Sequence, residues 1–243
     1  MTPLLIALQF LTRLPVSLPG IPTPEQVGRS LLWYPLVGLL LGLLLWGVHL
    51  LLGQTSAVLQ AAIILALWVG LSGGLHLDGL ADTADAWVGG FADRERTLVI
   101  MKDPRSGPIA VVVLVLLLLL KFAALFTLLQ AGQGIYLLLL PWLGRSLLPL
   151  LLATTPYVRV GGLGQALVEH LPRGQLPWVL GVHLLGMLLF GWMGLLALAT
   201  ALLLFIWLRR ALLRRLGGTT GDTAGALVEL GECGVLLALA LSL

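Results

Sequence analysis

Long apolar runs separated by short polar segments make up most of the chain. Four runs are each about twenty residues long, which is the length of a helix that crosses the hydrocarbon core of a bilayer; they cover residues 31–52, 57–75, 109–130 and 135–153. A fifth run, 177–208, is too long for one span and short for two. The distribution of positive charge favours two spans, joined by a tight turn at 191–194. A last run follows Gly217. The pattern predicts an all-α, polytopic membrane helix bundle with about seven spans, in a range of roughly six to eight.

The composition supports a membrane protein. Of the 243 residues, 59% are hydrophobic and 10% are charged, whereas soluble domains are about one quarter charged. The mean hydropathy is +1.05. These values exclude a soluble class and favour a single integral membrane domain over residues 1–243. The only cysteine, Cys233, lies in an apolar run, so no disulfide can form within the chain.

The positive charges predict the orientation of the bundle. With seven spans, twelve of the fourteen Lys and Arg residues fall on one side, and the opposite turns at 53–56, 131–134 and 191–194 carry none. Because Lys and Arg concentrate in cytoplasmic loops, we expect the N-terminus and the polar loops in the cytoplasm. The excess of positive charge is then explained by topology, and we expect no nucleic-acid partner. The chain opens without signal-peptide features, so we expect insertion through its first span.

The stretch 73–107 is the most polar part of the chain and reads GGLHLDGLADTADAWVGGFADRERTLVIMKDPRSG. Asp78, Asp82 and Asp85 are four and three residues apart, which places them on one face of a helix. We expect Gly89 and Gly90 to end this helix. The carboxylates repel one another unless a cation or protonation intervenes, and oxygen ligands suit Mg²⁺, Mn²⁺ or Ca²⁺. The alternative is a solvated acidic face between two spans.

Five further charged residues, Lys121, Arg145, Asp222, Glu229 and Glu232, lie at or inside predicted spans, where charge is costly and usually functional. Lys121 and Arg145 each require an anionic partner, which can be a carboxylate or a phosphate-bearing ligand. Asp222 and Glu229 are seven residues apart and share a face of the last helix. We expect both to contribute to a polar cavity, although Asp222 is also placed to be the N-cap of that helix.

Two sets of glycines are spaced for close helix packing. Gly38 and Gly42 lie four residues apart in the first span. Gly217, Gly221 and Gly225 repeat every four residues at the start of the last stretch of the chain. Small residues at this spacing let helix backbones approach closely, so we expect both sets to lie at helix contacts.

The acidic and basic residues together suit phosphoryl transfer. A divalent cation held by carboxylates neutralises phosphate oxygens, and Arg or Lys stabilises the charge that develops. Lys102 and Arg105, beside Asp103, are placed to clamp a diphosphate, although they also fit ordinary loop charges. His76 is close to Asp78 in sequence and can act as a base, as a hydrogen-bond donor to a phosphate, or as a residue that positions a neighbouring ligand. No P-loop, zinc spacing, dinucleotide fingerprint or serine nucleophile elbow is present.

Four sequence strings together carry a family resemblance. They are FLTRLPV near the N-terminus, GGLHLDGLADTADA, IMKDPRSG, and GGTTGDTAGALVELGE near the C-terminus. The combination covers nearly the whole chain and resembles the cobalamin synthase family, the adenosylcobinamide-GDP ribazoletransferases.

The resemblance implies a multi-pass enzyme of cobalamin biosynthesis in the bacterial inner membrane. Such a transferase uses a ribose hydroxyl of α-ribazole, or of its 5′-phosphate, to attack the cobinamide-linked phosphate of adenosylcobinamide-GDP. GMP leaves, adenosylcobalamin or its 5′-phosphate forms, and Mg²⁺ is required. The expected partners are these two substrates and the lipid bilayer, and the oligomeric state is open, a homo-oligomer included.

Combining the residue pattern with the resemblance gives a predicted active site on the cytoplasmic side. The expected metal ligands are Asp78, Asp82, Asp85 and Asp103. The expected catalytic residues are Asp82, Asp85 and Asp103, the last either as a further ligand or as the base for the ribose proton. The expected substrate and phosphate contacts are His76, Lys102, Arg105, Arg145, Asp222 and Glu229.

Two other functions fit parts of the pattern. The acidic stretch is similar to that of CDP-alcohol phosphotransferases acting on lipids, but their motif begins DGxxAR, and this chain reads Asp78-Gly79-Leu80-Ala81-Asp82, with Asp82 at the position of the motif's alanine. An ion-coupled transporter also places acids within spans, and transporters often contain two repeated halves. The DGLADTAD stretch occurs once, which disfavours the transporter.

Overall fold

The computed structural model describes residues 1–159, 161 and 163–243. Helices account for nearly all regular structure in that part of the chain, which contains a single isolated β-bridge between Tyr157 and Thr219. The elements are α1 (Thr2–Leu11), α2 (Pro24–Ser30), the 3₁₀ helix η1 (Leu31–Trp33), α3 (Tyr34–Leu52), α4 (Ala57–Ser72), α5 (Leu75–Gly89), α6 (Arg94–Ile100), α7 (Pro108–Gln130), the 3₁₀ helix η2 (Gly134–Leu138), α8 (Leu139–Thr154), α9 (Leu163–Glu169), α10 (Leu176–Leu188), α11 (Gly191–Leu216) and α12 (Gly221–Leu241).

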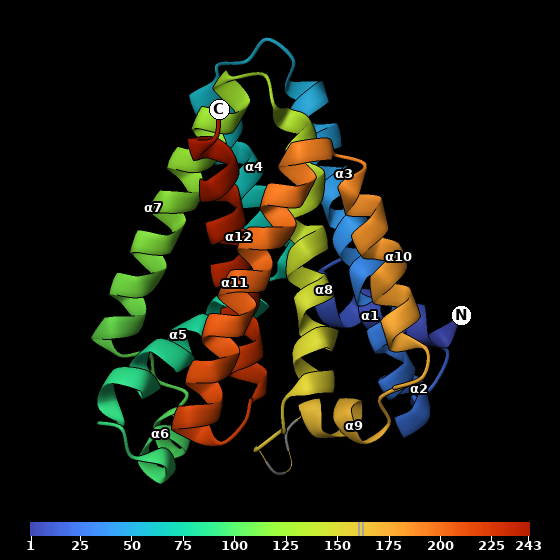
Figure 1. The fold of residues 1–243 in the computed structure, drawn as a ribbon, viewed down its shortest axis with the longest axis vertical. Helices are drawn as coiled ribbons and strands as arrows, with labels where there is room; N and C mark the ends of the chain where they lie inside the picture. The colour runs from blue at the N-terminus through green and yellow to red at the C-terminus, as the bar shows by residue number, and fades with distance from the viewer. Residues whose placement is uncertain (160, 162) are drawn as a thin grey trace.

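Helix α12 occupies the centre of the bundle and packs against α5, α7, α8 and α11 (Figure 1). Its N-terminus is fixed by a capping box, in which the Thr220 side chain accepts a hydrogen bond from the Thr223 N–H and the Thr223 hydroxyl accepts one from the Thr220 N–H. The N-cap of α12 is therefore Thr220, and Asp222 is free for another role. The cap interpretation of Asp222 was wrong.

The predicted multi-pass, all-α architecture is confirmed. Among the described residues, five helical segments are long and apolar enough to cross a membrane, and the bent pair α4–α5 makes a sixth candidate. Helix α10 is an apolar helix of 13 residues that runs beside α11, which is consistent with about seven crossings. The turn between these two helices lies at 189–190 rather than at the predicted 191–194, because Gly194 is buried against the Met187 carbonyl and continues α11.

The acidic helix leaves the bundle direction sharply. Helices α4 and α5 are bent by 86° at Gly73 and Gly74, which have φ values of 65° and 69°. This left-handed conformation suits glycine because it has no Cβ. Helix α5 consequently runs toward α6 and the polar end of the bundle (Figure 1), and we do not count it as a membrane-spanning segment. It ends at Gly89, as predicted.

The predicted glycine contacts are confirmed in part. A Cβ added to Gly38 of α3 would meet the backbone of α8, and one added to Gly42 would lie 2.7 Å from the carbonyl oxygen of Leu138, the last residue of η2. Gly225 of α12 packs closely on His76 of α5 in the same way. Gly217 differs, because it ends α11 with a φ of 72°. Gly221 makes no close contact, since a Cβ there would lie 3.9 Å from the Tyr157 hydroxyl.

The polar segments gather at one end of the bundle. Helices α2, α6 and α9 and the C-terminal end of α11 lie there, opposite the chain's C-terminus (Figure 1). The last turn of α11 contributes Arg214 and Arg215, and Arg215 donates hydrogen bonds to Trp87 at the end of α5 and to Thr97 of α6. The charged surface and the acidic helix are thus held together.

Candidate active site

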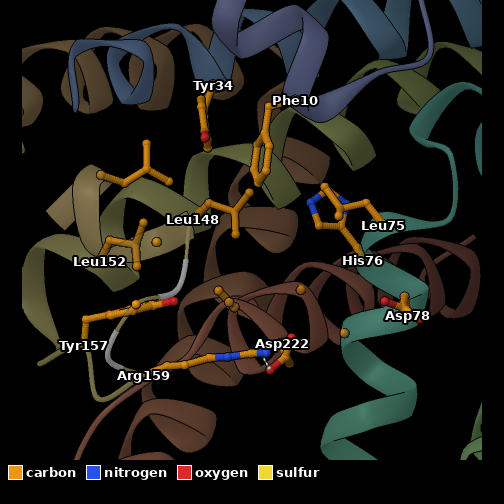
Figure 2. Close-up of a pocket in the computed structure, with 17 residues that line it drawn as sticks. Phe10, Tyr34, Leu75, His76, Asp78, Leu148, Leu152, Tyr157, Arg159 and Asp222 are labelled. Atoms are coloured by element: carbon orange, nitrogen blue, oxygen red, sulfur yellow. Dashed lines mark hydrogen bonds and ion pairs between the residues drawn. The ribbon is translucent and has the colours of Figure 1, made fainter. Parts of the chain in front are cut away.

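A cavity of about 380 Å³ opens among α1, α3, α5, α8 and α12 and the segment that follows α8. Its walls differ in character (Figure 2). One end is apolar and aromatic, and the other carries charged side chains, with His76 beside them. The residues that line the cavity include Phe10, Tyr34, His76, Asp78, Leu148, Leu152, Tyr157, Arg159 and Asp222. The volume lies within the range of small-molecule sites.

Arg159 and Asp222 form the charged end of the cavity. The Val158 N–H donates to the Thr219 carbonyl at 2.9 Å, and the Thr219 N–H donates to the Pro156 carbonyl at 2.8 Å. These bonds tie the segment after α8 to the start of α12. Arg159 NH1 consequently lies 2.6 Å from Asp222 Oδ2. Because a guanidinium offers several donors in a planar fork, Arg159 can hold Asp222 and still contact a phosphate.

Asp78 and Asp82 lie on the face of α5 near this pair. Asp78 lines the cavity, and Gly79 lets α5 approach the backbone of Asp222 so closely that a Cβ there would lie 2.8 Å from its carbonyl oxygen. Partial burial, together with the charges of Asp78 and Asp222, raises the pKa of Asp82 to about 6. The repulsion between carboxylates that the spacing predicted therefore acts on Asp82, and Asp222 of α12 adds to it.

Asp85, the third acid of the predicted face, stabilises the start of α7. Its carboxylate accepts hydrogen bonds from the Gly107 N–H at 2.5 Å and from the Ala110 N–H at 3.0 Å. These groups belong to the first turn of α7, which has no intrahelical acceptor for them, and the helix dipole favours a negative charge there. The structure thus gives Asp85 two backbone donors as partners.

The predicted phosphate clamp is divided between two places. Asp103 receives hydrogen bonds from Arg105 Nε at 2.9 Å and NH2 at 2.7 Å, and these bonds lower the pKa of Asp103 to about 2. This pair lies outside the cavity lining. Lys102 instead lines a smaller cavity of about 130 Å³ together with Arg159 and Thr220. Arg159 borders both cavities, so Lys102 and Arg159 form one cationic edge.

Arg145 and Glu229 belong to a buried network between α7, α8 and α12. Lys121 Nζ lies 2.6 Å from Glu229 Oε2 and 2.9 Å from Glu232 Oε2, and Arg145 NH1 pairs with Glu232 Oε1. Each of these side chains is at most 6% exposed. The carboxylate partners expected for Lys121 and Arg145 are therefore present. Neither Arg145 nor Glu229 is among the residues that line the cavity.

His76 connects the cavity with this network. Its side chain lines the cavity, is 3% exposed, and its Nδ1 lies 3.5 Å from Arg145 NH2. A guanidinium can only donate, so an interaction with Arg145 favours the tautomer with the proton on Nε2. His76 is then a hydrogen-bond donor at its other nitrogen.

The carboxylates near the cavity suit Mg²⁺, which needs few protein ligands, better than a metal ion whose ligands all come from the protein. Within residues 1–159, 161 and 163–243, no three His, Cys, Asp or Glu side chains are grouped closely enough to hold an ion. Asp78 and Asp82 form no ion pair in the part of the chain described. Mg²⁺ is typically held by one or two carboxylates, with waters and substrate phosphates completing its shell. Asp78 and Asp82 suit that arrangement.

Six of the nine cavity residues named above escaped the sequence prediction. Phe10, Tyr34, Leu148 and Leu152 lie in apolar segments and have no distinctive spacing. Tyr157 and Arg159 lie in a segment whose path is set by the bridge between Tyr157 and Thr219. The positive charge of Arg159 amid glycines was the one available signal, and it equally fits topology.

The fold and the cavity define a multi-pass membrane protein whose site combines a charged end with an apolar wall. The chain belongs to the cobalamin-5-phosphate synthase family, whose model matches residues 3–240. It is 86% identical over 238 residues to the adenosylcobinamide-GDP ribazoletransferase of Ectopseudomonas mendocina, covering 98% of each chain. It is 66% identical over 244 residues to the protein of that name from Pseudomonas putida, covering 100% of each chain.

The corresponding protein of Pseudomonas aeruginosa PAO1 is 68% identical over 238 residues, with 98% of this chain and 97% of that protein covered. No solved structure matches the chain significantly. The family predicted from the four sequence strings is thereby confirmed, and these comparisons favour the ribazoletransferase over the CDP-alcohol phosphotransferase and the transporter.

Proposed function

We propose that this protein joins α-ribazole, or α-ribazole 5′-phosphate, to adenosylcobinamide-GDP and releases GMP. The observation that carries the proposal is the cavity that combines Asp78, Arg159 and Asp222 at one end, in a chain of this family. Acidic groups that suit a divalent cation, next to Arg and Lys, are the components of phosphoryl transfer.

In this reaction a ribose hydroxyl oxygen forms a bond to the phosphorus attached to cobinamide. The bond between that phosphorus and the oxygen of GMP breaks, and GMP leaves. Arg159 and Lys102 would bind the diphosphate oxygens from the cationic edge. Asp82 would accept the hydroxyl proton, because its raised pKa brings its basicity close to the value that suits general-base catalysis near neutral pH. Asp103 is less suited, because Arg105 holds its pKa near 2.

We assign Mg²⁺ to Asp78, with waters and the phosphate oxygens of the substrate completing its coordination, because a cation bound to Asp82 would lower the pKa that suits this residue as the base. The cation would neutralise phosphate oxygens and stabilise charge on the leaving group. Asp222 stays with Arg159 and fixes the guanidinium beside the diphosphate. His76 supplies an N–H donor toward the same region.

We also propose that the polar end of the bundle, and with it the acidic helix, faces the cytoplasm of a bacterial inner membrane. The Lys and Arg of the loops support this orientation. A cysteine introduced at exposed Glu95, in a chain whose Cys233 is buried, provides a test. An impermeant thiol reagent should label it in inverted membrane vesicles but not in intact spheroplasts, and the reverse pattern would contradict the orientation.

The reaction is tested with purified protein in lipid nanodiscs. Adenosylcobinamide-GDP and α-ribazole 5′-phosphate are supplied with Mg²⁺, and GMP and the corrinoid product are measured by chromatography. We expect equal amounts of GMP and adenosylcobalamin 5′-phosphate, with loss of both after chelation and recovery on adding Mg²⁺. No GMP from folded protein, but CMP from a CDP-alcohol, would replace this function with the lipid phosphotransferase.

A further inference from the structure

We propose that the apolar end of the cavity is the subsite for the aromatic base of α-ribazole, and that Phe10, Tyr34, Leu148 and Leu152 select a methylated, weakly polar base. This inference rests on the proposed function and deepens it. It assigns the substrate's base and ribose to opposite ends of one cavity.

The apolar end is built around an aromatic pair. Phe10 of α1 and Tyr34 of α3 stack with ring centroids 6.3 Å apart and an angle of 24° between their planes. Phe10 is 36% exposed, whereas Tyr34 is 2% exposed. Tyr34 therefore supports Phe10 from the protein core, and Phe10 keeps surface that a ligand can cover. Flat aromatic groups stack well on such a surface.

The remainder of this end is aliphatic. Leu148 and Leu152, one turn apart on α8, are each 5% exposed and lie between the aromatic pair and Tyr157 (Figure 2). The base of α-ribazole is 5,6-dimethylbenzimidazole, whose benzo edge carries only carbon and hydrogen. Burying that edge against leucine gains free energy and leaves no polar atom without a partner.

The same wall disfavours guanine and adenine. Their edges carry several hydrogen-bond donors and acceptors, and burying these without partners is unfavourable. Charged residues that could satisfy them lie at the opposite end, with Arg159 and Asp222 (Figure 2). The guanosine of adenosylcobinamide-GDP is thus poorly suited to this end, and the cavity is small for a corrinoid.

The placement also orients the reaction. With the base between Phe10 and the leucines, the ribose points toward Asp78, Arg159 and Asp222. The attacking hydroxyl then meets the acidic face of α5, and the diphosphate of the second substrate meets the cationic edge formed by Lys102 and Arg159. One cavity end therefore fixes which substrate is the nucleophile.

The test is steady-state kinetics of GMP release in nanodiscs with three α-ribosyl phosphates as nucleophiles, carrying dimethylbenzimidazole, benzimidazole or adenine. For the wild-type protein we expect kcat/KM to fall in that order, with about a tenfold difference due to the two methyl groups. Phe10→Leu should raise KM for α-ribazole 5′-phosphate by about tenfold, while KM for adenosylcobinamide-GDP stays unchanged.

A second variant tests selectivity directly. Leu152→Asn offers an amide to a polar base and should narrow the preference for dimethylbenzimidazole over adenine by about tenfold or more, whereas Leu152→Met keeps the wall apolar and should retain it. Phe91→Leu is the control for Phe10→Leu, because Phe91 is 75% exposed and lies outside the cavity. Unchanged KM for adenosylcobinamide-GDP in each variant also shows that the protein is folded.

Two results would overturn the subsite. One is a base preference that is the same in wild type, Phe10→Leu and Leu152→Asn. The other is a rise in KM for adenosylcobinamide-GDP in place of α-ribazole 5′-phosphate, which would assign this end of the cavity to the other substrate. A wild-type protein that releases no GMP with any nucleophile would instead overturn the proposed function itself.

Discussion

Replacing Lys121 by methionine should destabilise the bundle strongly while leaving the chemistry intact. Lys121 Nζ contacts both Glu229 and Glu232 and lies 4.5 Å from the centroid of the Trp68 ring. The network contains two cations, Lys121 and Arg145, and two carboxylates. Lys121→Met leaves both carboxylates with Arg145 alone.

The expected loss follows from burial. Removing one partner of a buried ion pair costs about 3–5 kcal/mol, because the remaining charge has no compensation. For a chain of this length, each kcal/mol lowers Tm by about 2–4 °C, so Lys121→Met should melt about 10 °C lower. Glu229→Met should have a similar effect, since it leaves Glu232 to serve two cations. The double variant Lys121→Met/Glu229→Met restores neutrality and retains the pair between Arg145 and Glu232.

The assay is a double-mutant cycle of unfolding in mixed detergent micelles, with GMP release measured on the same preparations. We expect the sum of the two single losses of unfolding free energy to exceed the loss in the double variant by at least about 2 kcal/mol. We also expect the double variant to keep a kcat near that of the wild type, because Lys121 and Glu229 do not line the cavity. Leu119→Met, on the lipid-facing side of α7 where Leu119 is 58% exposed, is the control. Additive losses of unfolding free energy would refute the charge-balance reasoning. A stable double variant without activity would support the predicted role of Glu229 in substrate binding.

Three further predictions concern the site and its supports. Arg159→Lys should lower kcat/KM by at least about tenfold, because lysine lacks the planar fork that contacts Asp222 and phosphate together; Arg173→Lys is the control, and a wild-type rate in Arg159→Lys would contradict the assignment. Gly79→Ala should cost about 1–3 kcal/mol of stability, since its Cβ would lie 2.8 Å from the Asp222 carbonyl oxygen, whereas Gly47→Ala has open space; equal melting temperatures for the two would refute the close contact. Asp85→Ala should lose about 0.5–2 kcal/mol of stability from the uncapped start of α7, with smaller loss in Asp85→Asn, and an unchanged melting temperature in Asp85→Ala would exclude the capping role.

Sequence periodicity predicted the features that depend on one helix at a time. Apolar runs located the spans, and the spacing of Asp78 and Asp82 placed both on one face of α5. The need of Lys121 and Arg145 for anionic partners also followed from their position within spans. These inferences hold because the bilayer constrains each segment locally, whatever its neighbours are.

Features that depend on contacts between segments were harder to predict. Arg159 reaches Asp222 because two backbone hydrogen bonds join Val158 and Pro156 to Thr219, and no local pattern encodes that pairing. Asp85 has the spacing of a metal ligand, yet it meets the first turn of α7.

The misplaced turn before α11 has a related cause. A turn at the membrane edge needs few polar residues, so the sequence pattern placed Gly194 in the turn. In the structure Gly194 belongs to α11 and lies against the Met187 carbonyl of α10. Spacing alone does not distinguish a glycine that bends the backbone from one that permits a close contact.

The most direct test of the central claim is GMP release by Asp82→Asn at saturating Mg²⁺, in a single turnover with adenosylcobinamide-GDP and α-ribazole 5′-phosphate. Asp93→Asn is the matched control, because Asp93 caps α6 and asparagine retains that function. We predict a rate at least about 100-fold below wild type for Asp82→Asn and a wild-type rate for Asp93→Asn. A wild-type rate for Asp82→Asn would show that the acidic face of α5 is not the site of phosphoryl transfer.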